Sequence, residues 1–308
     1  MMKNSTSRVL VTGAKGFIGS ACIDLLGLED IDVYAVSSQN LKNEKYQNVT
    51  WVQLNLLDPQ SCEKIIKEIN PTHLLHLAWT AKPGKFWTDS ENFQWLKASL
   101  SLFESFFKNG GEHIVGVGTC AEYEPNQMEC SEFETPTLPS SLYGFCKLAC
   151  GIGAQASATL FDKQVTWGRL FYPYGPSEPP GRFLPDIIDH LLMQQPIKCG
   201  TGNQIRDFIY VKDVANVLIK LLKADMPGFI NIGSGDPVSL RDVAKIVTKE
   251  LGFSELIQFG TRQPLTQDSD RIVANIDRLK TDLKWTPSYS LEKGIKEMIK
   301  YRSEFLKK

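Results

Sequence analysis

A cluster of three glycines near the N-terminus constrains the fold of this chain more than any other feature. The apolar, β-branched run 8–12 predicts a strand, and the apolar spacing of 17–26 predicts a helix. Gly13, Gly16 and Gly19 fill the turn between them. The first glycine allows a sharp turn, and the last allows the helix to pack closely on the strand. The motif is therefore a strand-turn-helix unit of the kind that builds parallel sheets.

Further strand-like runs alternate with helix-like ones along the first half of the chain. The strand-like runs are 32–36, 49–54, 73–78, 112–117 and 165–171, and the helix-like ones include 61–69 and 92–107. Such alternation predicts a doubly wound parallel α/β sheet over residues 1–170, with a return segment near 207–235. Turn-rich segments and shorter, mixed elements then predict a smaller C-terminal α/β region that binds substrate, over 171–308.

Composition narrows the classes of partner and compartment. The chain has 308 residues, with 34 Lys and Arg against 35 Asp and Glu, so no overall field draws it to nucleic acid or an anionic membrane. Seven cysteines without a Cys-x-x-Cys pair argue against a disulfide framework or a zinc ribbon, and the four histidines lack metal-ligand spacing. The run 1–8 lacks a signal-peptide core, and no stretch of about 18 apolar residues occurs. We therefore expect a cytoplasmic protein without a metal site.

The glycine turn also has the register of a dinucleotide site. Gly16 lets backbone amides approach a pyrophosphate at the helix N-terminus, whereas a tight turn without ligand is the plainer alternative. After the second strand, a carboxylate would bind the ribose 2′-hydroxyl of NAD, but this chain has Ser37 and Ser38 followed by Gln39 and Asn40. These donors, with Lys42 nearby, favour NADP over NAD.

A second motif places a phenol and an ammonium on one helix face. Tyr143 and Lys147 are four residues apart, which brings their Cβ atoms to about 5–6 Å on a helix. A nearby cation favours the phenolate and moves the tyrosine pKa toward the working range of an acid or base. The pair alone is common on amphipathic helices, where it is a packed Tyr beside a solvated Lys. Beside the glycine turn, it indicates catalysis.

Together with the segment 118–123, these motifs resemble the extended short-chain dehydrogenase/reductase family, and the resemblance covers nearly the whole chain. It implies a Rossmann fold and a bound NADP or NAD that carries hydride. It also implies that Thr119 orients a carbonyl group and that Tyr143 transfers a proton at the sugar oxygen. Lys147 would tune Tyr143 and hold the nicotinamide ribose.

The resemblance further implies which residues surround the cofactor. Asn55 stands where Asp is usual beside the adenine, and its amide can still bond an exocyclic amine. His76 is interpreted as a structural residue beside the cofactor. The expected cofactor residues besides the three glycines are Phe17, Ile18, Ser37, Ser38, Asn55, Leu56, Leu77, Ala78, Tyr143, Lys147 and Phe171.

Two segments in the second half resemble the nucleotide-sugar-modifying members of the family. In 169–176 the match is good except that Tyr172 replaces the usual Asn, which puts the normal amide contact to substrate in question. In 200–215 the resemblance places Arg206 near the nucleotide, where a guanidinium suits a diphosphate. A nucleoside-diphosphate sugar is therefore the expected substrate.

The roles of one arginine and three tryptophans each have two interpretations. Arg271 fits a second diphosphate ligand, or a surface salt bridge with Asp268 or Asp270. Three tryptophans either line the pocket or fill a core: Trp79, Trp87 and Trp95. The resemblance also implies a homodimer through the helices around 98–107 and 143–159.

The residues directly after Thr119 narrow the choice of reaction. The 4,6-dehydratases that this chain resembles carry Asp-Glu there, but this chain has Cys120 and Ala121, with Glu122 one position too late. The expected preference for NADP favours a reductase that acts on the C4 keto group of a 4-keto-6-deoxy sugar. A 4-epimerase is the alternative enzyme. A non-catalytic NADP-sensing protein is disfavoured because all three catalytic residue types are present, and a reductase of small neutral ketones would have little use for Arg206.

Overall fold

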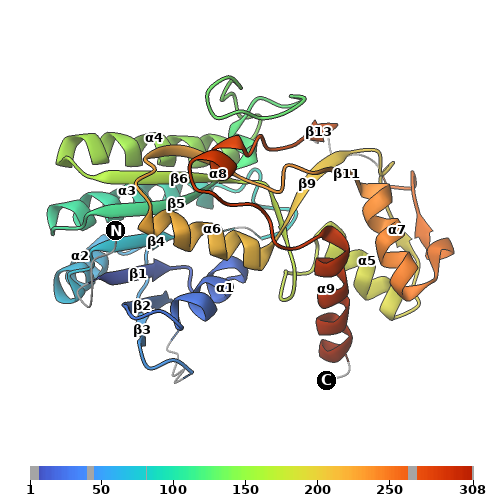
Figure 1. Ribbon diagram of the computed structural model, residues 1–308, viewed down its shortest axis with the longest axis horizontal. Coiled ribbons are helices and arrows are strands. Elements are labelled where there is room, and N and C mark those ends of the chain that lie inside the picture. Colours follow the sequence, from blue (N-terminus) through green and yellow to red (C-terminus); the bar gives the residue numbers. More distant parts are fainter. Residues whose placement is uncertain (1–6, 40–44, 81, 263–268, 307–308) are drawn as a thin grey trace.

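The computed structural model describes residues 7–39, 45–80, 82–262 and 269–306. A seven-stranded parallel sheet lies at its centre, with the strand order β10-β6-β5-β4-β1-β2-β3 (Figure 1). Its strands are β1 (Arg8–Thr12), β2 (Asp32–Ser37), β3 (Val49–Gln53), β4 (His73–His76), β5 (His113–Thr119), β6 (Gln164–Leu170) and β10 (Gly228–Ile232). The predicted doubly wound parallel sheet is confirmed.

Helices cover both faces of this sheet, because alternate strand residues point to opposite faces and both sets are apolar. On one face, α1 (Phe17–Leu26) and α6 (Val211–Lys223) pack against each other and share a core with Val9 and Val11. On the other face, Leu10 packs in a core with three helices: α2 (Pro59–Ile69), α3 (Glu91–Lys108) and α4 (Leu142–Phe161). Within the described ranges, no helix combines the length and the apolar character needed to cross a bilayer.

A second group of elements lies to one side of the sheet (Figure 1). Its helices are α5 (Phe183–Leu192), α7 (Leu240–Leu251) and α9 (Leu291–Phe305), which share a third core cluster. Its strands are β7 (Tyr172–Tyr174), β8 (Ile197–Lys198), β9 (Ile205–Tyr210), β11 (Pro237–Ser239), β12 (Ile257–Gln258) and β13 (Arg271–Ile272). Strand β7 comes directly after β6, so this group starts at the carboxyl edge of the central sheet, where ligands of open α/β sheets bind.

The chain crosses between the two groups more than once. Strand β9 pairs with β7, β11 and β13 in a small four-stranded sheet. After β9, α6 and β10 return the chain to the central sheet. Short helix α8 (Asp277–Thr281) then contacts β10 before the chain reaches α9. The return segment expected near 207–235 corresponds to α6 and β10, whereas a domain division at residue 170 stays a prediction.

Candidate active site

The glycine turn joins β1 to α1 through three close backbone approaches. Gly13 has a φ of +68°, and a Cβ added to it would lie 2.8 Å from the Ala78 amide nitrogen. A Cβ on Gly16 would lie 3.1 Å from the Gly13 carbonyl oxygen, and one on Gly19 would overlap that oxygen. Gly16 is the N-cap of α1 and contributes no capping side chain. The turn is therefore a cradle that side chains would fill, and its helix N-terminus fits a pyrophosphate.

The end of β2 carries hydroxyl and amide groups and meets a lysine from the glycine turn. Ser37 is buried, and its Oγ accepts a hydrogen bond from the Gln39 amide at 3.1 Å, while Ser38 is exposed. Lys15 Nζ donates to Gln39 Oε1 at 2.6 Å. The predicted Lys42 lies outside the described residues. Lys15 therefore brings positive charge to this edge, a contribution that sequence reasoning missed although the residue lies inside the glycine motif.

The other predicted cofactor residues lie at the ends of β3 and β4 and at the start of α1. Asn55 is exposed, and its Oδ1 accepts a hydrogen bond from the amide two residues further on at 3.1 Å, while Leu56 is buried. The amides of Leu77 and Ala78 donate to Thr12 Oγ1 at 3.2 and 3.3 Å. The half-buried residues that open α1 are Phe17 and Ile18. The sheet topology thus brings the tips of β1 and β4 together.

His76 is a structural group at this edge. Thr12 Oγ1 already accepts two amides, so its hydroxyl donates to His76 Nδ1 at 2.9 Å. His76 Nε2 then donates to Ser99 Oγ at 3.0 Å, and Ser99 donates to the Trp95 carbonyl. Burial and the nearby Lys147 charge lower the pKa of His76 to about 3. The neutral His76 side chain is therefore hydrogen-bonded at both ring nitrogens, and it links β1, β4 and α3.

The side chains of Thr119 and Tyr143 meet at the carboxyl end of β5. Thr119 is the last residue of that strand, and Tyr143 lies in the first turn of α4, which Ser141 caps by accepting the Gly144 amide. Burial raises the pKa of Tyr143, and a hydrogen bond with the Thr119 side chain opposes that rise. The rings of Phe86 and Trp87 pack edge-on against the phenol, with centroids at 4.8 and 5.8 Å.

Lys147 lies one helical turn further along α4. Its Nζ donates to the Val117 carbonyl at 2.8 Å and lies 4.2 Å from the centroid of the Trp79 ring. The side chain is 4% exposed, and burial lowers its pKa to about 8. The three predicted catalytic residues thus share one edge of the sheet, and Trp79 belongs to the same site.

The predicted substrate residues lie on the small sheet beside this edge. Strand β9 pairs with β7 and with β13, which places Tyr172 opposite Phe208. The guanidinium carbon of Arg206 lies 5.2 Å from the centroid of the Tyr172 ring, and its Nη1 donates to the Ile205 carbonyl. Burial raises the pKa of Cys120 to about 12 and the Arg206 charge opposes this, so Arg206 lies within electrostatic reach of the residue after Thr119. Arg206 is itself 2% exposed.

Two other predicted residues are held by contacts within the protein. Arg271 Nε donates to the Met128 carbonyl at 2.6 Å, and Asp268, one of its two proposed acidic partners, lies outside the described residues. Phe171 is 1% exposed and packs near Tyr123 in the core. Its side chain therefore offers almost no surface to a cofactor, which leaves its backbone for that role.

Glu122 occupies the centre of a buried polar network behind Thr119. Its Oε1 accepts from the Thr119 amide at 2.9 Å and from Trp167 Nε1 at 3.1 Å. Its Oε2 accepts from Arg169 Nε at 2.9 Å, and the glutamate is 0% exposed. Both carboxylate oxygens are therefore held by protein donors, so the group is a structural anion.

The loop between β7 and α5 brings Arg182 within electrostatic reach of the Tyr143 phenol. The charge of Arg182, the residue that precedes α5, acts on Tyr143 and favours its ionised form against the effect of burial. A Cβ on Gly181 would lie 3.0 Å from the Pro83 Cβ. Sequence reasoning missed Arg182, because no motif spacing links it to Tyr143.

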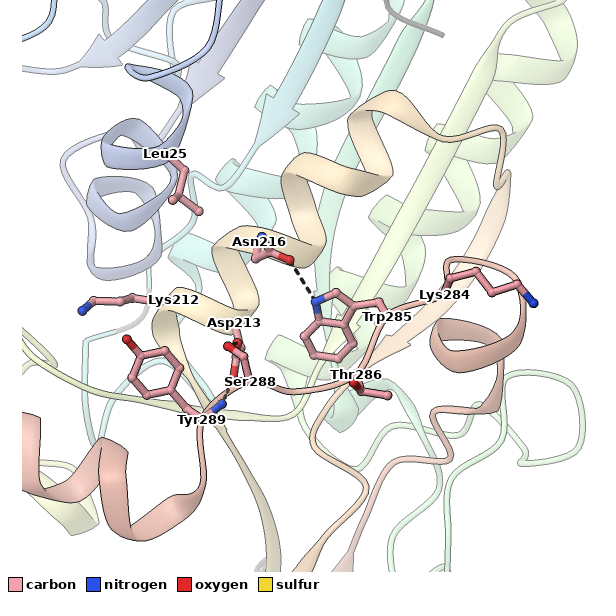
Figure 2. Close-up of a pocket in the computed structure, with 9 residues that line it drawn as sticks. All are labelled: Leu25, Lys212, Asp213, Asn216, Lys284, Trp285, Thr286, Ser288 and Tyr289. Carbon is pink, nitrogen blue, oxygen red and sulfur yellow. Dashed lines mark hydrogen bonds between the residues drawn. The ribbon is translucent and has the colours of Figure 1, made fainter.

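A separate hollow of about 400 Å³ lies between α1, α6 and the segment before α9 (Figure 2). Asp213 accepts hydrogen bonds there from Ser288 Oγ and the Tyr289 amide, and Trp285 Nε1 donates to Asn216 Oδ1. Among the described residues that line it, none belongs to the predicted site. These contacts attach the C-terminal segment to α6.

Comparisons with known proteins show the family and the fold of this chain. A family model described as the NAD dependent epimerase/dehydratase family matches residues 9–233. CDP-abequose synthase of Salmonella typhimurium is 27% identical over 307 residues, which cover 95% of this chain and 97% of that protein. A dTDP-4-dehydro-6-deoxyglucose reductase of Escherichia coli is 25% identical, with 95% and 96% covered. A UDP-glucuronate 4-epimerase of Thermodesulfobacterium geofontis is 26% identical, with 96% of each chain covered.

Solved structures are similar over nearly their whole length. A UDP-N-acetylglucosamine 4-epimerase from Methanobrevibacter ruminantium, in complex with UDP-N-acetylmuramic acid, matches with a TM-score of 0.86 at 26% identity, covering 97% of this chain and 99% of that one. A UDP-glucose 4-epimerase from Thermotoga maritima matches with a TM-score of 0.87 at 22% identity, covering 97% and 99%. At 22% identity, the Thermotoga maritima structure supports the fold alone.

Proposed function

This chain belongs to the NAD dependent epimerase/dehydratase family, and on that premise we propose that it reduces the C4 keto group of a nucleoside-diphosphate 4-keto-6-deoxy sugar with NADPH. The family places it among NAD(P)-dependent enzymes of the extended short-chain dehydrogenase type that modify nucleotide sugars. The observation that carries the proposal is the end of β2, where Lys15 and the Ser37 hydroxyl lie and the usual NAD-binding carboxylate is replaced. The E. coli relative bears the name of a reductase of such a sugar.

The residues of the site have complementary roles in this reaction. Bound NADPH supplies the hydride, and the protein supplies the proton and the orientation. Thr119 donates a hydrogen bond to the substrate carbonyl, and Tyr143 gives its phenolic proton to the developing alkoxide. Burial keeps the phenol protonated near neutral pH, since it raises the pKa of Tyr143. That protonation state suits a reductase, which needs an acid at this position.

The residues directly after Thr119 do not support a 4,6-dehydratase reaction. Cys120 is a buried thiol whose pKa burial raises to about 12, and Ala121 has no acid or base. Glu122 uses both carboxylate oxygens to bond Thr119, Trp167 and Arg169. A 4,6-dehydratase needs an additional acid and base in this segment, so reduction remains the proposed reaction. The second candidate is 4-epimerisation, because a 4-epimerase is among the relatives.

The proposal is tested by mixing the protein with NADPH, then NADH, and a panel of nucleoside-diphosphate 4-keto-6-deoxy sugars. Stoichiometric loss of absorbance at the reduced-nicotinamide band is expected with NADPH and one of these sugars. If sugar isomers interconvert without net oxidation of the cofactor, the protein is an epimerase and the reductase proposal is wrong.

Lys15 gives a test of the cofactor choice. Lys15→Ala is expected to raise the dissociation constant of NADPH about tenfold, because an ammonium within reach of the 2′-phosphate forms a charge-assisted hydrogen bond. NADH binding should not change. Fluorescence titration measures both constants, with Lys108→Ala at the exposed end of α3 as the matched loss of charge. Equal weakening of NADPH and NADH would contradict the assignment.

Arg206 gives a test of the substrate class. Arg206→Ala is expected to raise KM for a nucleotide sugar about tenfold or more, because a guanidinium bonds a diphosphate through charged contacts. The KM for a small neutral ketone should not change. Steady-state kinetics with both substrates decides this, and an unchanged KM for the nucleotide sugar would remove Arg206 from the diphosphate site.

A homodimer is part of the same proposal. An exposed apolar stripe runs along α4 and includes Phe145, Ile152 and Leu160. Such a stripe on a helix is typical of a face that packs on a second helix. Sedimentation equilibrium tests it, since a dimer has twice the 34.6 kDa mass of the chain.

We also propose a cytoplasmic location. Seven cysteines that are free and buried fit a reducing compartment, and cell fractionation tests the proposal.

A further inference from the structure

Trp79 lies three residues after the end of β4, against the side chain of the catalytic lysine. The Lys147 Nζ is 4.2 Å from the indole centroid, within the range of a cation–π contact. The same nitrogen donates to the Val117 carbonyl at 2.8 Å. Since Lys147 is 4% exposed, water contributes little to the solvation of its charge. The Val117 carbonyl and the Trp79 face therefore solvate it closely, and the Trp167 ring lies further away, with its centroid at 6.0 Å from Nζ.

A fully buried asparagine holds the indole in this position. Asn92 Oδ1 accepts from Trp79 Nε1 at 2.8 Å. Asn92 Nδ2 donates to the carbonyls of Phe86 and Asp89 at 2.7 and 2.8 Å. One amide thus fixes both the indole and the segment whose rings, Phe86 and Trp87, pack on Tyr143. The arrangement ties the surroundings of Lys147 to those of the phenol.

We propose that Trp79 is a positioning residue that keeps the Lys147 ammonium charged and oriented, with Asn92 fixing the indole. The inference rests on the proposed function in one respect, that Lys147 holds the cofactor ribose. Trp79 acts through Lys147, so it is assigned no part in the transfer of hydride or of the Tyr143 proton.

Among the described residues, the other groups that face Lys147 are the Trp167 ring, with its centroid 6.0 Å from Nζ, and three titratable side chains. His76 on β4 is neutral, because burial lowers its pKa to about 3. Cys150 on the same helix keeps its proton, because burial raises its pKa to about 12. Glu122 is the charged neighbour, and its charge favours the ammonium. None of these groups contacts the indole through a hydrogen bond, so a change at Trp79 leaves them in place.

The test compares two variants that both lose the Nε1 hydrogen bond to Asn92. Trp79→Phe keeps an aromatic face toward Lys147, and Trp79→Leu removes it. The pKa of Lys147 is followed through its ¹³Cε resonance, assigned with Lys147→Arg, and NADPH binding is followed by fluorescence from pH 6 to 10. We expect Trp79→Leu to lower the pKa of Lys147 by about one unit relative to Trp79→Phe, and to weaken NADPH binding about fivefold near pH 8.

Fluorinated tryptophan at position 79 keeps the size and the Nε1 donor and weakens the negative ring face, so it tests the contact even if Trp79→Leu does not fold. The pKa of Lys147 is expected to fall as fluorine is added. An unchanged lysine pKa across this series, or identical behaviour of Trp79→Phe and Trp79→Leu, overturns the role of Trp79. If the lysine pKa shifts as expected but the unmodified protein binds neither NADPH nor NADH, the proposed function is wrong and the positioning role stands.

Discussion

Tyr143→Phe is expected to lower kcat by about 10²- to 10⁴-fold, the usual loss when a general acid is removed. The phenylalanine keeps the ring that packs against Phe86 and Trp87, so the surrounding wall is preserved. The variant loses the hydroxyl that bonds the Thr119 side chain and that gives the proton. NADPH affinity should fall far less than kcat, because Lys147 and the glycine turn remain intact while the Tyr143 hydroxyl is one of several cofactor contacts.

The matched control is Tyr301→Phe on α9, where the phenol accepts a hydrogen bond from Ser177 outside the site. Its kcat should equal that of the parent protein. Steady-state rates with NADPH and the sugar identified in the panel measure both variants. A Tyr143→Phe variant that keeps more than about a tenth of the parent kcat would show that another group supplies the proton.

The pH dependence of the parent reaction is determined by the same residues. Burial raises the pKa of Tyr143, so the phenol stays protonated through neutral pH, and it lowers the pKa of Lys147 to about 8. Since Lys147 is charged below that pKa, its contribution to cofactor binding is present at neutral pH and lost as the pH rises through about 8. The alkaline limb of the rate profile is therefore assigned to Lys147.

Much of this site could be predicted because its residues are linked by short spacings. The glycine turn is confirmed as a strand-turn-helix unit, since each glycine meets a steric demand that the motif itself expresses. Thr119 and Tyr143 come together because one ends a central strand and the other opens the helix beside it. The parallel sheet is then predicted by the alternation of strands and helices, without any knowledge of side-chain contacts.

The unpredicted parts depend on residues that are distant in the sequence and carry no spacing signal. The spacing of Tyr143 and Lys147 predicts that the ammonium moves the phenol pKa toward the working range, but burial raises that pKa. The Val117 carbonyl and the Trp79 ring hold the ammonium instead. Asn92 has no motif, and only its complete burial and three hydrogen bonds reveal its role. Three strands of the small sheet, β7, β11 and β13, have two or three residues, too few for a periodic pattern.

Glu122→Leu is expected to lower the free energy of unfolding by about 3–5 kcal/mol, since it leaves a buried charge without its partner. Arg169 Nε loses its carboxylate, and the guanidinium keeps the Tyr123 hydroxyl and the faces of Tyr123 and Phe229, with Glu132 within electrostatic reach. Equilibrium urea denaturation measures the loss. Glu63→Gln, which breaks an exposed pair on α2, should have no measurable effect.

The double variant Glu122→Leu with Arg169→Leu separates the ion pair from the packing around it. If the cost of Glu122→Leu is chiefly the unpaired guanidinium, removing Arg169 as well should recover part of the stability. No recovery would mean that the Thr119 amide and Trp167 Nε1, which also lose their acceptor, account for the cost. In either case the Thr119 backbone loses the hydrogen bond that holds it at the end of β5. The stability of this network and the position of the Thr119 hydroxyl, for which we propose a catalytic role, are therefore coupled through one carboxylate.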